Sequence, residues 1–251
     1  MGTSAAERRA FVLRRLHSLS GVVPLGVFLG EHLWTNATAL GGQRPFDEAV
    51  GRLQRTPGLL AFEIFAIFLP LAFHAGYGLR IAVAGRPNGL RYPYGANWRY
   101  LLQRFSGVAA LVFIVVHLAE LRVPKAAGRL RPEDFYPTLE AHLSSTTGGV
   151  PWVALGYAVG LVATVFHFAN GLWSFTVTWG LVASRRAQAR AGWAALAVGL
   201  VLFALGLQTL VFFATGSRAF SPGTEHPAEE PGVIAGERPC PTPSPPGGFS
   251  P

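Results

Sequence analysis

The sequence has 251 residues, of which 50% are hydrophobic and 14% are charged. With a mean hydropathy of +0.34, the chain is too apolar for an ordinary soluble domain, which predicts a membrane protein. The single cysteine, Cys240, excludes a disulfide framework, an iron–sulfur cluster and a cysteinyl zinc site on this chain. The net charge of +8 is spread between apolar segments without a basic tract. The positive charges are therefore better explained by the orientation of the chain in a membrane than by binding of nucleic acid.

Five apolar segments are long enough to cross a bilayer, because a transmembrane helix needs about 20 apolar residues. Pro24 and Pro70 lie inside the first two segments, where neighbouring helices can satisfy the carbonyls that a proline frees. We therefore expect an all-α membrane protein built as a five-helix bundle. The segments run over residues 16–40, 58–84, 105–121, 151–182 and 192–216.

The arginines predict the orientation. The N-terminus and the loops at 80–104 and 183–191 together hold 12 cations and one acid, Glu7. The positive-inside rule places these segments in the cytoplasm and the C-terminus outside the membrane. We expect a membrane domain over residues 1–216. Residues 217–251 are rich in proline, glycine and glutamate, which predicts a disordered external tail.

Four of the five spans carry one histidine each: His32, His74, His117 and His167. Any one of them alone is explained equally well by a neutral contact between helices. Four together favour two bis-histidine haem irons, since ligand sites in bundles are built from facing helices. Zinc also accepts imidazoles, but four ligands at different depths cannot converge on one ion.

The depth of each histidine predicts how they pair. At about 1.5 Å per residue, His32 and His117 both fall in the outer half and can share one haem. His74 lies only about 9 Å from Arg80, near the cytoplasm. His167 is harder to place, because it lies about 27 Å from Arg185.

His167 can meet His74 only if the fourth helix continues past the membrane, with Trp179 at the interface. Gly160, His167, Gly171 and Ser174 share one helical stripe. Small residues there would admit a porphyrin, and small-residue helix packing explains them equally well.

Four quoted segments resemble the cytochrome b subunit of succinate dehydrogenase and fumarate reductase, of the type with five helices and two haems b. They are RRLHSLSGVVPLGVFLGEHLWTN, AFEIFAIFLPLAFHAGYG, LQRFSGVAALVFIVVHLAE and TVFHFANGLWSFTVTWG. The resemblance covers about residues 9–215 and keeps the order of the histidines. It implies that His74 and His167 bind the haem nearer the cytoplasm, and that His32 and His117 bind the distal haem.

The resemblance also implies partners. Members of this family work in the bacterial cytoplasmic membrane with a flavoprotein subunit that holds FAD and with an iron–sulfur subunit, usually with menaquinone. We expect this chain to anchor both subunits in the lipid bilayer and to carry electrons to or from quinone. Two alternatives are a dihaem cytochrome b of a hydrogenase or formate dehydrogenase, and a haem-free transporter.

Arg15, Ser18 and Arg104 lie where propionates of the inner haem would emerge, and arginine suits carboxylates. Positive-inside anchoring explains the same arginines. For the quinone we expect a site near the distal haem, with Glu63 as its proton carrier. An acidic helix start is the competing explanation for Glu63. Other polar or aromatic residues at that end are Glu31, Trp34, Asn36 and Glu120.

Overall fold

The computed structural model describes residues 4–85 and 95–217. The described chain is almost entirely helical. The α-helices are α1 (Ala5–Val22), α2 (Pro24–Ala37), α3 (Gln43–Gln54), α4 (Leu59–Phe62), α5 (Leu69–Ala84), α6 (Gly95–His117), α7 (Val123–Ala126), α8 (Phe135–Leu143), α9 (Trp152–Thr178) and α10 (Arg185–Thr215). Two short 3₁₀ helices are η1 (Thr38–Gly41) and η4 (Pro132–Asp134), and two π-helices are η2 (Glu63–Phe68) and η3 (Leu118–Arg122).

Five helical stretches of the described residues are long and apolar enough to cross a membrane. Large apolar side chains such as Val27, Phe65 and Val112 are exposed on their outer faces, as expected where the solvent is lipid. The all-α, five-span architecture predicted from the sequence is confirmed. The spans cover Ala5–Gly41, Leu59–Ala84, Asn97–Ala126, Trp152–Thr178 and Arg185–Thr215.

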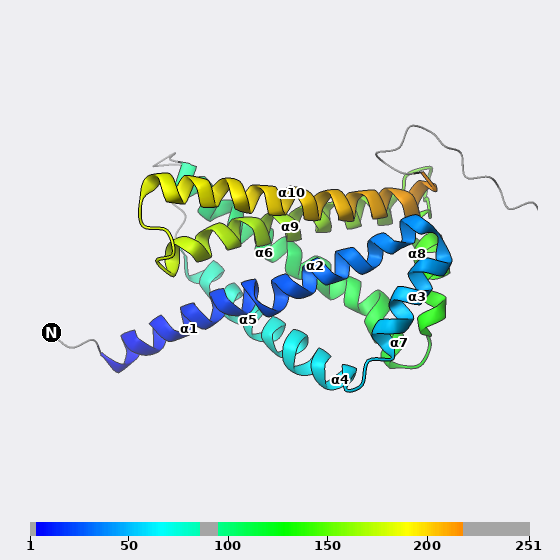
Figure 1. Cartoon of the computed structure of the whole chain (residues 1–251), viewed down its shortest axis with the longest axis horizontal. Helices are drawn as coiled ribbons and strands as arrows, with labels where there is room; N and C mark the ends of the chain where they lie inside the picture. Colours follow the sequence, from blue (N-terminus) through cyan, green and yellow to red (C-terminus); the bar gives the residue numbers. More distant parts are fainter. Residues whose placement is uncertain (1–3, 86–94, 218–251) are drawn as a thin grey trace, which may run out of the picture.

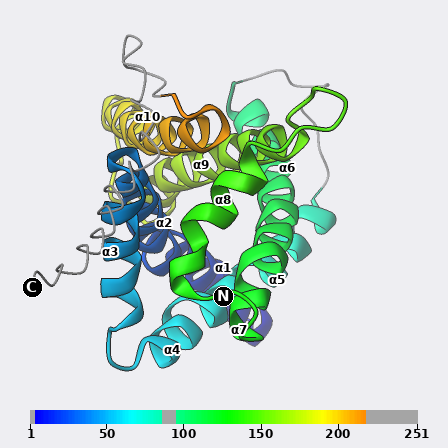
Figure 2. The ribbon, with the colours of Figure 1, turned by 90° about the vertical axis from the view of Figure 1, so that its right-hand side faces the viewer.

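The spans form a bundle with two distinct ends (Figure 1). The start of α1, the ends of α5 and α9, and the starts of α6 and α10 lie together at one end, here called the arginine-rich end. The opposite end, here called the capped end, is covered by α3 and α8 (Figure 2). The described arginines of the first end are Arg8, Arg9, Arg14, Arg15, Arg80, Arg99, Arg104, Arg185, Arg186 and Arg190.

The cap contains a cluster of buried apolar side chains. Phe46 of α3, Tyr136 of α8 and Phe213 of α10 are buried against one another, with ring centroids 5.2–6.0 Å apart. Full burial of one such aromatic side chain stabilises a fold by about 1.5–3 kcal/mol. This packing therefore holds α3, which follows the first span, and α8, which follows the third span, over the end of the bundle.

The helix ends follow local rules. Ser4 and Glu7 form a capping box at the start of α1, and the Ser184 hydroxyl accepts from the Ala187 amide at the start of α10. Because these caps lie beyond the apolar runs, the first and fifth helices begin earlier than the apolar residues alone predict. The predicted end of the fourth helix at residue 182 is wrong. It ends at Thr178, where Gly180 turns the chain with φ of +70°.

Both π-helices stand just before a proline. Pro70 follows η2 and Pro124 follows η3. Because proline has no amide hydrogen, a carbonyl in the preceding turn loses its usual partner, and a π-helical turn rearranges the bonding there. This gives a physical reason for both segments. The tail expected at 217–251, including Cys240, lies outside the described residues apart from Ser217.

Candidate functional site

The structure brings the four span histidines together in two pairs. The rings of His32 on α2 and His117 on α6 have centroids 5.8 Å apart and cross at 85°. Those of His74 on α5 and His167 on α9 have centroids 6.1 Å apart and cross at 87°. We call these the capped-end pair and the arginine-rich pair. The pairs match those predicted from the sequence, while the role of the residues as ligands stays a prediction.

The helix bounds explain why His167 meets His74. We expected a long fourth helix that ends at residue 182, and it ends at Thr178. His167 therefore lies about 16 Å from the end of its helix, and His74 lies about 15 Å from the end of α5 at Ala84. Counting from Arg185 placed His167 too far out, because residues 179–184 form a turn rather than helix.

The two pairs are separated along the bundle. Tyr157 contacts His117 and lies ten residues before His167 on α9. At about 1.5 Å per residue, this separates the pairs by about 15 Å. The bundle thus holds two similar histidine arrangements at two depths, connected by continuous α-helix.

Each of three histidines has its Nδ1 near an oxygen. Nδ1 of His74 lies 2.9 Å from the carbonyl oxygen of His17, and Nδ1 of His167 lies 3.0 Å from that of Gln103. Nδ1 of His117 lies 3.3 Å from the hydroxyl of Tyr157. Such partners hold the proton on Nδ1 and leave the lone pair of Nε2 available to a metal.

The ring separations suit two imidazoles on opposite sides of one metal ion. A metal–imidazole bond is about 2 Å long, so two axial rings have centroids roughly 6 Å apart. The donor set, two imidazoles for each ion, fits a haem iron.

Two glycines are closed to a porphyrin: Gly160, from the stripe at His167, and Gly26, which lies near His32 in the sequence. A Cβ on Gly160 would overlap the ring of Phe113, and one on Gly26 would overlap Phe168. These positions are filled by aromatic side chains, so they serve helix packing and leave no room for a porphyrin. Ser174 likewise bonds the carbonyl of Gly171 in its own helix.

The arginine-rich pair has a fifth histidine beside it. For this residue the sequence left open a propionate contact, a contact with the iron–sulfur subunit and a solvated position at the membrane interface. His17 of α1 stacks on His74 with centroids 4.1 Å apart. Its Nδ1 is buried without a hydrogen-bond partner among the described residues, as is Nε of Arg104. Unsatisfied donors at the same end of the bundle fit a carboxylate such as a propionate.

The three propionate contacts expected from the sequence are less clearly placed. Arg15 lies over the rings of Phe11 and Trp179, at 4.9 and 5.1 Å from their centroids. Arg104 bonds the carbonyl of Ile81 and the hydroxyl of Tyr100 through Nη2. Ser18 is half-buried on α1. The structure does not bring Arg15 and Arg104 into a single described cluster.

Gln103 is a residue that the sequence interpretation missed. Its amide nitrogen donates to the carbonyl oxygen of His167, and its amide oxygen accepts from Asn170. Ser106 lies 3.5 Å from Nδ1 of His167. These contacts join α6 to α9 around one histidine. The available signal was the helical spacing of Gln103 and Ser106, three residues apart at the start of the third span.

Acidic residues at the capped end have partners. Glu63 of η2 forms an ion pair with Arg122 of η3 at 2.7 Å, and Lys125 lies 3.9 Å away. Glu120 accepts a hydrogen bond from Tyr157 at 3.1 Å, and Nε2 of His142 lies 3.3 Å from it. We predicted Glu63 as a proton carrier, with an acidic helix start as the competing explanation, and the structure joins it to the neighbouring span.

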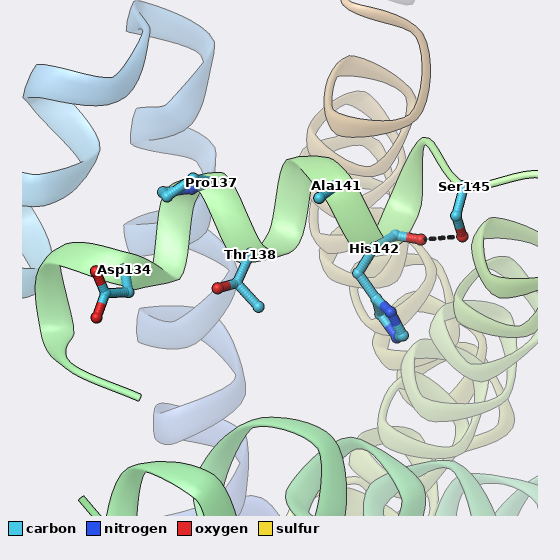
Figure 3. A pocket seen from close by; sticks show the side chains of 6 residues that line it. All are labelled: Asp134, Pro137, Thr138, Ala141, His142 and Ser145. Atoms are coloured by element: carbon cyan, nitrogen blue, oxygen red, sulfur yellow. Dashed lines mark hydrogen bonds between the residues drawn. The ribbon is translucent and has the colours of Figure 1, made fainter. Parts of the chain in front are cut away.

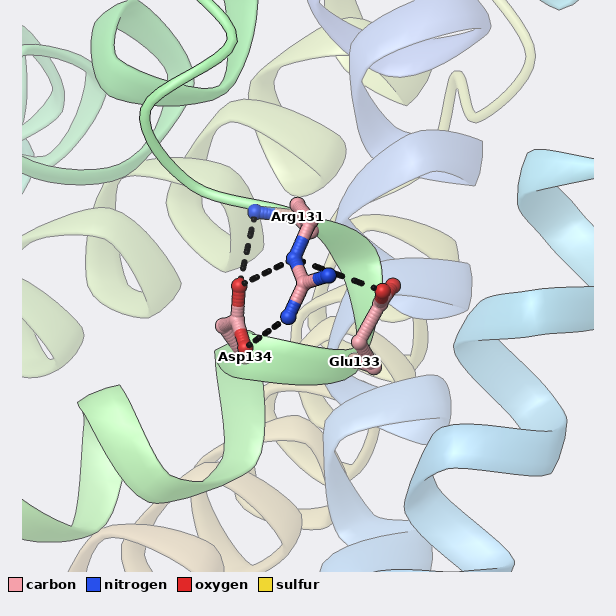
Figure 4. A network of polar contacts seen from close by, with 3 residues as sticks. All are labelled: Arg131, Glu133 and Asp134. Atoms are coloured by element: carbon pink, nitrogen blue, oxygen red, sulfur yellow. Dashed lines mark hydrogen bonds and ion pairs between the residues drawn. The ribbon is translucent and has the colours of Figure 1, made fainter.

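His142 reaches this cluster from the cap. It lines a shallow pocket on α8, and its ring points away from the α8 backbone toward the bundle (Figure 3). Its carbonyl accepts from Ser145. At the start of α8, Arg131 binds Glu133 and Asp134 on the exposed surface (Figure 4). These last contacts fix the loop rather than the histidine pairs.

Comparison with known proteins decides the family. A family model described as the succinate dehydrogenase/fumarate reductase transmembrane subunit matches residues 90–206. The succinate dehydrogenase cytochrome b558 subunit of Bacillus subtilis (strain 168) is 40% identical over 205 residues, which is 82% of this chain and 98% of the relative. The chain belongs to this family. Like other members, this cytochrome b subunit is the membrane anchor of a succinate:quinone oxidoreductase.

Proposed function

We propose that this subunit binds two haems b, one in each histidine pair, and carries electrons along the bundle between an iron–sulfur subunit and a quinone. Two pairs of crossed histidines, one at each of two depths, support this proposal. The ring centroids are 5.8 Å apart in the capped-end pair and 6.1 Å apart in the arginine-rich pair. A haem iron supplies one-electron transfer when it is bound by two such imidazoles.

The chain's own residues would hold and orient these groups. His74 and His167 would ligate one iron through Nε2, while the carbonyls of His17 and Gln103 keep their Nδ1 protonated. His32 and His117 would ligate the other. His17 and Arg104 each have a buried donor nitrogen without a partner in the described chain, which suits a propionate of the haem in the arginine-rich pair.

The arginine-rich end is the proposed cytoplasmic face. Its cations favour the cytoplasmic side of the membrane, and they provide a surface for the iron–sulfur and flavoprotein subunits. Dicarboxylate chemistry would occur on the flavoprotein with its FAD, because the described chain is a membrane bundle with no dicarboxylate site assigned to it. This arrangement puts the arginine-rich pair next to the iron–sulfur subunit.

The quinone, proposed to be menaquinone, would react near the capped-end pair on the outer side. Electrons that enter at the arginine-rich pair need the second haem only if they must cross to that end. Glu63 remains our proposed proton carrier there. Its ion pairs with Arg122 and Lys125 give it a structural role as well. Comparing Glu63→Gln with Arg122→Gln distinguishes proton transfer from this structural role.

The proposal is tested on the purified complex. We expect co-purification with the flavoprotein and iron–sulfur subunits, a reduced-minus-oxidised spectrum of haem b, and two haems for each copy of this chain. Succinate-dependent quinone reduction should accompany them. A complex with one haem would contradict the dihaem proposal. A haem-free chain would support the transporter alternative.

A further inference from the structure

His117 differs from the other paired histidines in what its Nδ1 faces. Nδ1 of His74 and Nδ1 of His167 lie nearest the backbone carbonyls of His17 and Gln103. The hydroxyls of Ser20 and Ser106 lie 3.4 and 3.5 Å from these nitrogens, and each donates to the same carbonyl. His117 faces the side-chain hydroxyl of Tyr157 at 3.3 Å. A hydroxyl can pass on the effect of a further partner, whereas a backbone carbonyl in a helix is already engaged.

The further partner is a carboxylate. The Tyr157 hydroxyl lies 3.1 Å from Oε2 of Glu120 and donates to it. Since the hydroxyl has a single hydrogen, its oxygen must accept from Nδ1–H of His117. The hydrogens therefore run in one direction, from His117 to Tyr157 to Glu120. This order selects the tautomer of His117 whose Nε2 is free to bind iron.

The chain of contacts reaches the cap at His142. Nε2 of His142 is 3.3 Å from the same Oε2 of Glu120, but it is not aligned as a hydrogen bond and counts as a buried nitrogen without such a partner. Its ring also stands over Tyr157, with centroids 6.4 Å apart. The contact is therefore steric and electrostatic, and it keeps Tyr157 and Glu120 in place beneath α8.

We propose that Tyr157 and Glu120 are positioning residues that lower the reduction potential of the haem iron bound by His117. The proposal rests on the dihaem function proposed above. A carboxylate that draws the Nδ1 hydrogen through Tyr157 makes the imidazole a stronger electron donor. A stronger donor stabilises the ferric state, so the haem becomes harder to reduce. The arginine-rich pair has only neutral carbonyls and serine hydroxyls at this position and would lack this effect.

The test is Tyr157→Phe in the whole complex, followed by optical redox titration of both haems. We expect both haems to be retained and one midpoint potential to rise. Loss of an outer partner of a metal ligand typically costs 10–100-fold in metal affinity or activity. A tenfold change in the equilibrium constant corresponds to 59 mV for a one-electron couple. The potential of the other haem should stay unchanged.

The matched control is Tyr136→Phe, which removes a hydroxyl in the cap core and should shift neither haem. His117→Met identifies the haem that belongs to His117, since methionine also ligates haem and alters its spectrum. Glu120→Gln keeps an oxygen acceptor and removes only the charge, so it should raise the same potential. If Tyr157→Phe loses haem, the midpoint potentials of Glu120→Gln test the proposal instead.

Three results would overturn the inference: unchanged potentials in both variants with both haems retained, a shift confined to the other haem, or haem loss from both variants. The last would make the two residues structural. Each outcome is distinct from failure of the dihaem proposal, which would already be visible as fewer than two haems in the unaltered complex.

Discussion

Gly107 of α6 lies directly against His167 of α9. A Cβ built on Gly107 would be 2.7 Å from Cε1 of that imidazole, and one on Gly21 of α1 would overlap the ring of His74. Each member of the arginine-rich pair thus rests on a glycine of a neighbouring helix. The positions of these two imidazole rings therefore depend on the absence of a Cβ at Gly107 and Gly21.

Alanine at either glycine should therefore disturb the arginine-rich pair. Real Cβ atoms essentially never approach a neighbour below 3.0 Å, so Gly107→Ala must displace the ring of His167. We expect loss or a high-spin signature of one haem, measured by pyridine haemochrome and electron paramagnetic resonance. Gly156→Ala on the same helix as His167 has open space and should keep both haems. Two intact low-spin haems in Gly107→Ala would contradict this packing.

The Glu63–Arg122 ion pair predicts a second set of variants. The two side chains are only 16% and 24% exposed. Removing the Glu63 charge leaves Arg122 without this partner, and removing the Arg122 charge leaves Glu63 only the 3.9 Å contact with Lys125. We expect Glu63→Gln and Arg122→Gln each to destabilise the complex by about 1–3 kcal/mol, as measured by thermal unfolding. Glu48→Gln is the control, since its pair with Arg44 is 4.0 Å long and exposed and should contribute little.

The same variants separate the two roles of Glu63. If Glu63 carries quinone protons, Glu63→Gln should abolish quinone-linked turnover, while succinate oxidation with a dye acceptor and the haem content stay normal. Arg122→Gln should then retain quinone turnover at moderate temperature. Equal loss of turnover in both variants would point to the ion pair, and normal turnover in Glu63→Gln would rule out an essential proton carrier.

The cap loop should respond to acid through Asp134. Hydrogen bonding and charge from Arg131 lower the pKa of this carboxyl below its ordinary value of 3.8. A lowered pKa in the folded state means that the contact contributes at higher pH and is lost as the pH falls through that lowered value. Hydrogen exchange around residues 128–136 should be faster in Asp134→Asn than in the unaltered chain at pH 7. The two should converge well below pH 3.8, and a difference that persists there would contradict the assignment.

The orientation can be checked with the single cysteine. Cys240 follows the fifth span, and the positive-inside rule places it outside. An impermeant maleimide should label it in intact cells, or in spheroplasts where an outer membrane is present. Labelling only after lysis would reverse the topology, provided that the thiol is reactive in the native complex.

The sequence was sufficient for the spans and for the pairing of His32 with His117, because both depend on local properties, namely apolar length and the cost of a polar ring in lipid. The pairing of His74 with His167 came from the family resemblance, since the depth count placed His167 too far out. The contacts of Tyr157, Gln103 and His17 were missed because they depend on the rotation of one helix against another. That rotation is set by glycine–aromatic packing, such as Gly160 on Phe113, which a single sequence does not display.

The cap was missed for a different reason. The segments after the first and third spans were taken as loops, although Phe46, Val50 and Leu53 repeat at spacings of four and three residues, which is typical of an amphipathic helix. That pattern could have revealed α3. Its packing on α8 and α10 could not be inferred, because the buried residues of the cap come from segments far apart in the sequence.

The central claim is that the two crossed histidine pairs hold two haems, and haem quantification in the four single histidine variants tests it most directly. His74→Ala and His167→Ala should each lose or perturb the same haem, and His32→Ala and His117→Ala should each affect the other. Full retention of two unperturbed haems in any one of these variants would remove that histidine from the ligand set and contradict the account.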